Sequence, residues 1–345
     1  MVNGRFGTVA GVVTTNDVFF NIVSRVNSPM ELSIISVNWN SVGYLRECIE
    51  SIYERTHGVS FEIIVVDNAS PQGGVNALSE EFPQVRIIHS QKNLGFAGAN
   101  NLGFRASSGR YLLFLNPDTK LVSAAVNIML QQLESLPDGG VLGCKLLNTD
   151  LSVQITSIQK FPTIVNQVLD LEYFQLRWPG CPLWNIDPLF SDSRAPLEVE
   201  VISGACMLLK REVFEQVGMF TEDYFMYAED IDLNYKVMKA GFTNYYIGSA
   251  CIVHHGGGSS KQEVGQWATV MKYRAMGKLF RNTGGLLYGG LYRTTMACAA
   301  AGRLLILALA YPLANVLWNK QSFQFAVRKW TVILKWALGR QTLAL

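Results

Sequence analysis

The sequence predicts an α/β protein built on a doubly wound, mostly parallel β-sheet, followed by a helical C-terminal extension that associates with a membrane. Short apolar runs alternate with amphipathic segments over the first 120 residues, the order that builds parallel sheets. Several of these runs end in polar clusters, as strands do at the ligand-binding edge of such sheets. From residue 264 onward the chain becomes apolar and basic.

Length and composition indicate how the chain is divided. A chain of 345 residues exceeds one ordinary domain, so we expect an N-terminal extension over 1–29, a main domain over 30–263 and a helical tail over 264–345. The extension lacks the layout of a signal peptide. The six cysteines are scattered without a Cys-x-x-Cys pair, which is typical of reduced cysteines in a cytosolic protein rather than of a zinc site.

The charge distribution is asymmetric. Residues 264–345 contain 11 Lys or Arg and no Asp or Glu, whereas the first 263 residues contain 18 basic and 27 acidic side chains. A basic, apolar tail on an acidic body favours an anionic membrane surface as a partner. A nucleic-acid partner is disfavoured, because the tail is rich in Leu, Ala and Trp and has no base-reading module.

The apolar patterns predict the order of the elements. They indicate strand 32–37, helix 44–53, strand 61–66, helix 75–82, strand 85–89, a glycine-rich segment leading into a helix after 93, strand 112–115, strand 141–147, strand 199–209, helix 211–217 and strand 245–253. Residues 148–197 lose this periodicity and contain five prolines. Insertions of that length are usually functional or mobile.

The predicted strand 112–115 is the centre of this pattern. It is an unbroken apolar run, which suits a strand buried on both faces, and Asn116, Pro117 and Asp118 follow it directly. Ligands bind beyond the carboxyl ends of such strands, so Asp118 is a candidate ligand of a phosphate-bound metal. An ordinary turn is the alternative.

Asp67 follows the predicted strand 61–66 and is a second candidate. Its carboxylate can accept hydrogen bonds from a base N–H or a ribose hydroxyl. The chain has no Gly-x-Gly-x-x-Gly loop, so a dinucleotide site of the Rossmann type is disfavoured.

Three carboxylates, Glu229, Asp230 and Asp232, begin another predicted helix after a run of large aromatic residues. Acids favour the first turn of a helix because of its dipole, and that remains the alternative. Apolar rings beside a carboxylate raise its pKa, which suits a general base.

Two histidines, His254 and His255, follow the predicted strand 245–253 and precede three glycines. Imidazole nitrogens bind metals, and glycine backbone amides approach phosphate closely. A solvated or structural histidine pair is the alternative.

Together these motifs resemble family 2 inverting glycosyltransferases, in particular bacterial rhamnosyltransferase-like enzymes of O-antigen and cell-wall polysaccharide assembly. The resemblance covers about residues 32–260, in family order: VNWN at 37–40, VDNAS at 66–70, NLGFA at 93–97, LNPD at 115–118, SGA at 203–205, YAEDID at 227–232 and His254 with its glycines. It implies a GT-A fold, a nucleoside-diphosphate sugar donor and a divalent metal, Mg²⁺ or Mn²⁺.

The resemblance also implies residue roles. Asp230 matches the catalytic base, and Glu229 and Asp232 would orient the acceptor or the base. Asp118 and His254 would hold the metal, and the partner position of Asp118 in the family's Asp-x-Asp motif is Asn116 here. One carboxylate fewer leaves the metal more dependent on the diphosphate. The donor would contact Val37, Asn38, Asn40, Asp67, Asn68, Asn93, Phe96, Asn100 and Asn116.

The tail is expected to lie on the membrane. Residues 296–318 are strongly apolar, but Arg303 divides them, and the remaining 304–318 is shorter than the roughly 20 residues of a spanning helix. Tryptophans and basic residues follow, so interfacial helices on the cytoplasmic leaflet are favoured. A packed helical subdomain or a homodimer interface is the alternative.

The main hypothesis is therefore an inverting, metal-dependent glycosyltransferase. It would move a sugar, with rhamnose as the first candidate, to a hydroxyl of a lipid-linked saccharide at the inner face of the cell membrane, in surface polysaccharide assembly. Galactofuranose, N-acetylglucosamine or glucose are alternative sugars. A catalytically silent scaffold that binds sugar nucleotides is the alternative of a different class.

Overall fold

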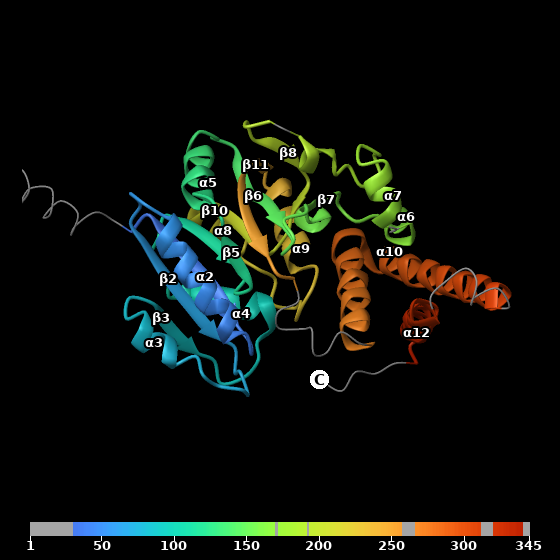
Figure 1. Cartoon of the computed structure of the whole chain (residues 1–345). Coiled ribbons are helices and arrows are strands. Elements are labelled where there is room, and N and C mark those ends of the chain that lie inside the picture. Colours follow the sequence, from blue (N-terminus) through green and yellow to red (C-terminus); the bar gives the residue numbers. More distant parts are fainter. Residues whose placement is uncertain (1–29, 170–171, 192, 257–265, 312–319, 341–345) are drawn as a thin grey trace, which may run out of the picture.

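The computed structural model describes residues 30–169, 172–191, 193–256, 266–311 and 320–340. The predicted extension over 1–29 lies outside the described residues. The described chain forms an α/β body and a group of C-terminal helices at one end of it (Figure 1).

The first part of the body alternates strands and helices in the predicted order as far as residue 115, and the strand 119–121 and the helix 125–134 that follow were not predicted. Its elements are β1 (Leu32–Asn38), α2 (Val42–Arg55), β2 (Phe61–Asp67), α3 (Ala77–Glu81), β3 (Arg86–His89), α4 (Gly95–Arg105), β4 (Tyr111–Leu115), β5 (Thr119–Leu121) and α5 (Ala125–Glu134).

The second part adds further strands and an insertion of short elements. They are β6 (Gly139–Leu147), β7 (Ile158–Gln159), α6 (Ile164–Val168), α7 (Glu172–Arg177), β8 (Leu197–Val199), β9 (Val201–Ile202), β10 (Cys206–Lys210), α8 (Arg211–Gln216), α9 (Glu229–Lys239) and β11 (Thr243–His254). The segment predicted as one strand over 199–209 is thus divided, because the loop 203–205 interrupts it.

The strands join in the order β3-β2-β1-β4-β10-β6-β11-β5, with β8 paired to β11. The pairs among β3, β2, β1 and β4 are parallel, as is β6 with β11. β10 runs antiparallel to both of its neighbours, with Cys206 opposite Leu115. This reversed strand brings the loop 203–205 to the edge where β4 ends.

The central strand β4 is buried on both faces, as predicted. Tyr111, Leu113 and Leu115 join one hydrophobic core, with α2 and α5, while Leu112 and Phe114 join the other, with α4 and α8. This alternation follows from the two-residue period of a strand. The doubly wound arrangement is therefore confirmed.

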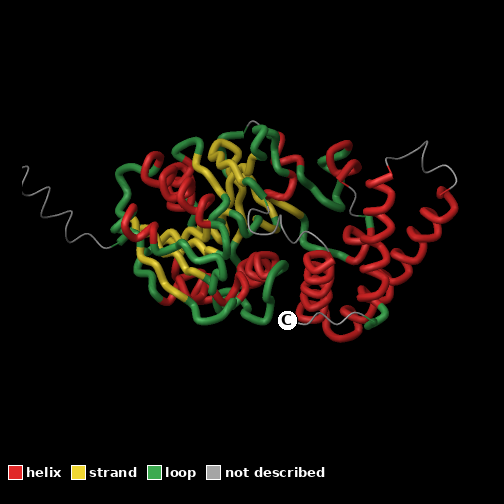
Figure 2. The backbone as a smooth tube through the Cα atoms, turned by 60° about the horizontal axis from the view of Figure 1, so that its bottom comes forward, coloured by secondary structure: helices red, strands yellow, loops and turns green. Residues whose placement is uncertain are grey.

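The C-terminal helices are α10 (Gln266–Ala310) and α12 (Lys320–Ala337). α10 bends at Gly285, whose φ of 83° is left-handed, and Figure 2 shows both of its halves beside α12 at one end of the molecule. A third core joins Tyr224 and Ile231 of the body to Met276 of α10 and Ile333 of α12. The helices are therefore anchored to the body.

The structure differs from the sequence prediction at Arg303. Arg303 interrupts the apolar stretch as expected, but it lies within the continuous helix α10, which begins well before it, and its guanidinium donates to the carbonyl oxygen of Val168 at 2.5 Å. Among the described residues, Trp267–Ala310 is long and apolar enough to cross a membrane, by length and composition alone. Part of the predicted stretch 304–318 lies outside the described residues.

Candidate active site

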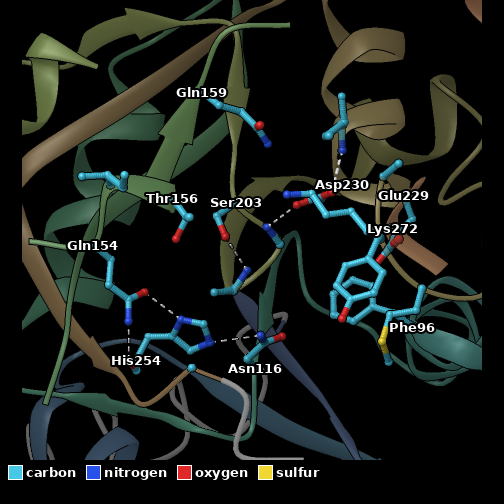
Figure 3. Close-up of a pocket in the computed structure, with 18 of the residues that line it drawn as sticks. Phe96, Asn116, Gln154, Thr156, Gln159, Ser203, Glu229, Asp230, His254 and Lys272 are labelled. Atoms are coloured by element: carbon cyan, nitrogen blue, oxygen red, sulfur yellow. Dashed lines mark hydrogen bonds between the residues drawn. The ribbon is translucent and has the colours of Figure 1, made fainter. Parts of the chain in front are cut away.

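A cavity of about 1480 Å³ opens at the sheet edge where β1 and β4 end. Its walls come from these strand ends, the loop 203–205, the start of α9, the insertion between β6 and β8, and the C-terminal helices. Figure 3 shows ten of the lining residues with labels. The predicted site residues that line it are Val37, Asn68, Asn93, Phe96, Asn116, Asp118, Glu229, Asp230 and His254.

Asp118 and His254 lie together on the cavity wall. The Asp118 Oδ1 is 3.3 Å from His254 Nε2, and Asn116 Nδ2 is 3.4 Å from the same nitrogen. The antiparallel pairing of β5 and β11 sets His254 opposite Thr119, the residue after Asp118. One carboxylate and one imidazole meet here, and in the described part of the chain no three His, Cys, Asp or Glu side chains converge.

Gln154, in the insertion, fixes the ring of His254 (Figure 3). Its Oε1 is 3.0 Å from His254 Nδ1, and its Nε2 donates to the His254 carbonyl oxygen at 2.6 Å. Because the amide oxygen of Gln154 can only accept, this contact holds a proton on Nδ1 and turns Nε2 toward Asp118. Sequence reasoning missed Gln154, which belongs to none of the motifs.

Asp230 is held by two backbone amides. Gly204 N–H donates to Oδ2 and Ile231 N–H donates to Oδ1, both at 2.9 Å. Burial raises the pKa of Asp230, and these hydrogen bonds partly oppose that rise. The loop 203–205 approaches so closely that a Cβ on Gly204 would lie 3.3 Å from the Asp230 Cβ.

Glu229 is nearly inaccessible, with 6% of its surface exposed. Among the residues that the structure describes, none forms a hydrogen bond with its Oε2. Burial, and then the neighbouring charge of Asp230, raise the pKa of Glu229 well above its usual value. The cavity wall therefore places two neighbouring carboxyl groups together, both with a pKa raised by burial.

The backbone just before α9 is strained. Tyr227 and Ala228 both have left-handed φ angles, 70° and 66°, which non-glycine residues adopt rarely and mostly at functional sites. This turn places Tyr227, Glu229 and Asp230 on the cavity wall.

Asp232 lies elsewhere. It is buried, accepts a hydrogen bond from the Thr221 hydroxyl at 2.6 Å and lies 3.4 Å from Lys236 Nζ. It does not line the cavity. The reason is helical geometry, since residues two positions apart on a helix point about 200° apart. Its contacts fix the segment leading to α9 and give no support to the expected contact with an acceptor.

Asp67 and Asn38 form a polar cluster at the ends of β1 and β2, where they lie opposite each other. Asp67 Oδ1 accepts from Asn38 Nδ2 at 2.8 Å and from Ser70 Oγ at 2.6 Å. Ser70 Oγ also accepts from the Asn40 N–H. None of these residues lines the cavity, although their chain neighbours Trp39 and Asn68 do.

Asn68 and Asn93 shape the loop before α4. Asn68 Nδ2 donates to Asn93 Oδ1 at 2.9 Å, and Asn68 Oδ1 accepts from Leu94 N–H at 2.8 Å. Asn100 instead donates to the Phe96 carbonyl oxygen within its own helix and does not line the cavity.

A family model described as glycosyl transferase family 2 matches residues 33–218. The chain is 29% identical over 237 residues to an N-acetylglucosaminyl-diphospho-decaprenol L-rhamnosyltransferase of Mycobacterium tuberculosis, covering 65% of this chain and 76% of that protein. It is 24% identical over 231 residues to the rhamnosyltransferase WbbL of Escherichia coli K12, covering 64% and 82%.

Two solved structures share the fold. A mannosyltransferase of Pyrobaculum calidifontis, solved with GDP-mannose and Mn²⁺, superposes with a TM-score of 0.58 at 15% identity over 94% of this chain and 93% of that chain. GalNAc-T7, solved with UDP, GalNAc and Mn²⁺, gives 0.51 at 14% identity over 66% and 44%.

The match of the family model to more than half of the chain agrees with the motif order and with the geometry of the cavity. The fold is GT-A, as expected. The chain belongs to glycosyl transferase family 2, in its rhamnosyltransferase-like branch.

Proposed function

We propose that this glycosyltransferase is inverting and metal-dependent, and that it transfers rhamnose from a nucleoside-diphosphate sugar to a hydroxyl of a lipid-linked saccharide in surface polysaccharide assembly. One observation carries the proposal. Asp230, with both carboxylate oxygens held by backbone amides, shares one cavity with Asp118 and His254. The rhamnosyltransferase relatives support the sugar and the acceptor class.

Asp230 would act as the general base. It takes the proton of the acceptor hydroxyl while that oxygen forms a bond to the anomeric carbon, and the bond from that carbon to the diphosphate oxygen breaks. Attack from the face opposite the diphosphate inverts the configuration. The raised pKa of Asp230 makes it a stronger base than an exposed aspartate.

The residues present fit a divalent metal. Asp118 would supply a carboxylate oxygen and His254 would supply Nε2, with Gln154 holding the other ring nitrogen. Oxygen and imidazole ligands suit Mn²⁺, and an oxygen-rich shell completed by a diphosphate suits Mg²⁺. When bound, the ion would neutralise the charge of the departing diphosphate.

The donor pocket would use the asparagine-rich loops. Asn68 and Asn93 hold the loop before α4, and Phe96 lies on the cavity wall. The hydrogen-bonded cluster of Asn38 and Asp67 would support recognition of the base and the ribose of the donor.

The membrane part of the proposal rests on the C-terminal helices. Residues 264–345 contain 11 basic and no acidic side chains, and α10 leaves apolar side chains such as Leu287 and Leu309 exposed. These features favour docking on an anionic cytoplasmic leaflet, where lipid-linked acceptors reside.

The substitution Asp230→Asn tests the mechanism. Asn keeps the shape but cannot accept the proton, so kcat should fall by about 10² to 10⁴-fold, while the dissociation constant of the donor changes little. Asp223→Asn is the matched control and should keep wild-type kcat, because the Asp223 side chain is 71% exposed, pairs with Lys278 and does not line the cavity. An Asp230→Asn protein with full activity would remove the assigned base and favour a different mechanism.

A further inference from the structure

The insertion between β6 and β8 carries an exposed apolar surface that the transfer reaction does not explain. We name it the α6–α7 patch; its members are Val165, Leu169, Tyr173, Phe174, Leu176 and Trp178, with exposed fractions from 37% to 71%. The rings of Phe174 and Trp178 stack with centroids 5.6 Å apart, and Tyr173 meets Phe174 edge-on at 5.5 Å. A clustered aromatic surface of this kind marks an interaction site.

Hydrogen bonds hold the patch in place. The Thr163 hydroxyl and the Asn166 side chain cap the start of α6 reciprocally. Asn166 Nδ2 also donates to the Leu183 carbonyl oxygen at 3.2 Å, and Trp184 Nε1 donates to the Trp178 carbonyl oxygen at 2.6 Å. Hydrogen bonds therefore fix the backbone at the start of α6 and at Trp178, on either side of the exposed aromatic side chains.

The patch lies beside the C-terminal helices. Ile164 and Val168, on the inner side of α6, pack against the core that α10 and α12 complete. Arg303 of α10 donates to the Val168 carbonyl oxygen and stacks over the Trp330 ring of α12 at 4.1 Å. Figures 1 and 2 both place α6, α7 and these helices at the same end of the molecule.

The same elements enclose the outer part of the cavity. Asn166 and Gln167 of α6, Leu176 of α7 and Lys272 of α10 all line it. The patch and the C-terminal helices therefore belong to elements that also form part of the cavity wall.

We infer that the α6–α7 patch is a second membrane-contact element, which enters the boundary between headgroups and acyl chains beside α10 and α12. The inference rests on the proposed docking of the C-terminal helices. It adds that the insertion, together with these helices, directs the cavity mouth toward the bilayer, so that the saccharide of a lipid-linked acceptor reaches Asp230 while its lipid stays in the membrane.

Charge and residue type select a bilayer over a protein partner. The adjoining helices belong to a segment with 11 basic and no acidic residues, which complements anionic headgroups. Trp and Tyr are the side chains that favour the membrane interface. The sequence around α7 includes the acidic residues Asp170 and Glu172, which anionic headgroups do not attract. The patch would therefore contribute apolar contact, and the C-terminal helices would contribute the positive charge.

The test compares two double variants of the full chain on vesicles of phosphatidylglycerol and phosphatidylcholine in equal parts. Tyr173→Ser with Trp178→Ser should weaken vesicle partitioning by about tenfold, because two exposed aromatic side chains lose their lipid contact. Its salt dependence should match that of the wild type, since no charge is removed. Val122→Ser with Leu151→Ser removes exposed apolar residues outside the patch and should bind as the wild type does.

Fluorescence quenching measures directly whether the patch contacts the acyl chains of the bilayer. Brominated acyl chains should quench the fluorescence of the wild type more than that of Trp178→Phe, and the difference reports Trp178 alone. Equal quenching, together with wild-type partitioning of the Tyr173/Trp178 variant, would overturn the inference while leaving docking of the C-terminal helices intact. Nucleoside-diphosphate release with a soluble saccharide acceptor, measured on the same preparations, tests sugar transfer independently of the membrane.

A second copy of the chain is the competing occupant. Sedimentation of the wild type without vesicles should show a monomer. A dimer that the Tyr173/Trp178 variant abolishes would show that the patch joins two copies, and the membrane inference would be wrong.

Discussion

At the scale of single residues, the site depends on the contact by which Gln154 orients the ring of His254. Gln154 holds Nδ1 as the protonated nitrogen, so Nε2 can bind a metal. Gln154→Ala should weaken Mn²⁺ binding by about 10 to 100-fold, the usual effect of losing such an outer ligand contact. Calorimetric titration of Mn²⁺ in the presence of a nucleoside diphosphate measures this.

The matched control for Gln154 is Gln159→Ala, which removes another glutamine from the cavity wall. It should leave Mn²⁺ affinity at the wild-type value. Equal affinities for the wild type and Gln154→Ala would show that Gln154 does not orient the histidine.

The buried carboxyl of Glu229 should make the stability of the protein depend on pH. Burial raises its pKa well above the usual value, so the native state binds a proton that the unfolded state has lost. Stability therefore falls as pH rises from the ordinary glutamate pKa toward the raised one. Glu229→Gln removes this cost and should raise Tm at neutral pH by about 2 to 4 °C, as roughly 1 kcal/mol does in a large domain.

The gain in Glu229→Gln should shrink as the pH is lowered toward the ordinary glutamate pKa, because wild-type Glu229 is then protonated in both states. Calorimetry at several pH values measures it. A Tm that is unchanged at every pH would show that Glu229 is ionised and paired in the native protein.

Sequence reasoning predicted which residue types gather at the site better than it predicted their contacts. Asp118, His254, Glu229 and Asp230 all line the cavity, because each lies at or next to the end of a strand or helix with a clear pattern. Gln154 could not be found, since its contact with His254 spans 100 residues and depends on how the insertion folds back.

At the scale of elements, the start of α4 is built around one close approach. Gly95 has a φ of 70°, and a Cβ there would lie 2.1 Å from the Phe225 carbonyl oxygen. That oxygen accepts from the Phe96 N–H at 2.9 Å. The loop before α9, which lines the cavity with Tyr227, therefore depends on glycine at this position.

Gly95→Ala should lower stability by about 1 to 3 kcal/mol, because it combines backbone strain with a backbone clash. Donor affinity should fall as the Phe225 loop moves. Thermal unfolding and donor titration measure the two effects. Gly43→Ala is the control, since its Cβ meets nothing within 4 Å, and a Gly95→Ala protein as stable as this control would contradict the close packing.

The elements that the sequence predicted best are those with an unbroken local signal. The apolar run 112–115 predicted a strand buried on both faces, and every residue of β4 is buried in the structure. The direction of β10 could not be predicted, because an antiparallel strand and a parallel one carry the same apolar run. The short elements of the insertion were also missed, since α6 and α7 contain five and six residues and show no full period.

At the scale of the whole molecule, the C-terminal helices and the catalytic body form one structure. Tyr224 and Ile231 flank the site residues in sequence and pack with Met276 and Ile333 of the helices. Sequence analysis weighed interfacial helices against a packed subdomain. The structure shows helices that pack on the body along one side and leave apolar residues exposed along another, a combination that suits membrane docking.

We propose that Asp118, His254 and Asp230 form a metal-dependent site for transfer from a sugar nucleotide. The most direct measurement is nucleoside-diphosphate release by the full chain from a panel of nucleotide sugars, with Mn²⁺ or Mg²⁺ and with or without chelator. A rhamnose nucleotide should give metal-dependent release of its nucleoside diphosphate and should protect the protein from thermal unfolding. Absence of binding by every sugar nucleotide, or release that a chelator leaves unchanged, would contradict this proposal.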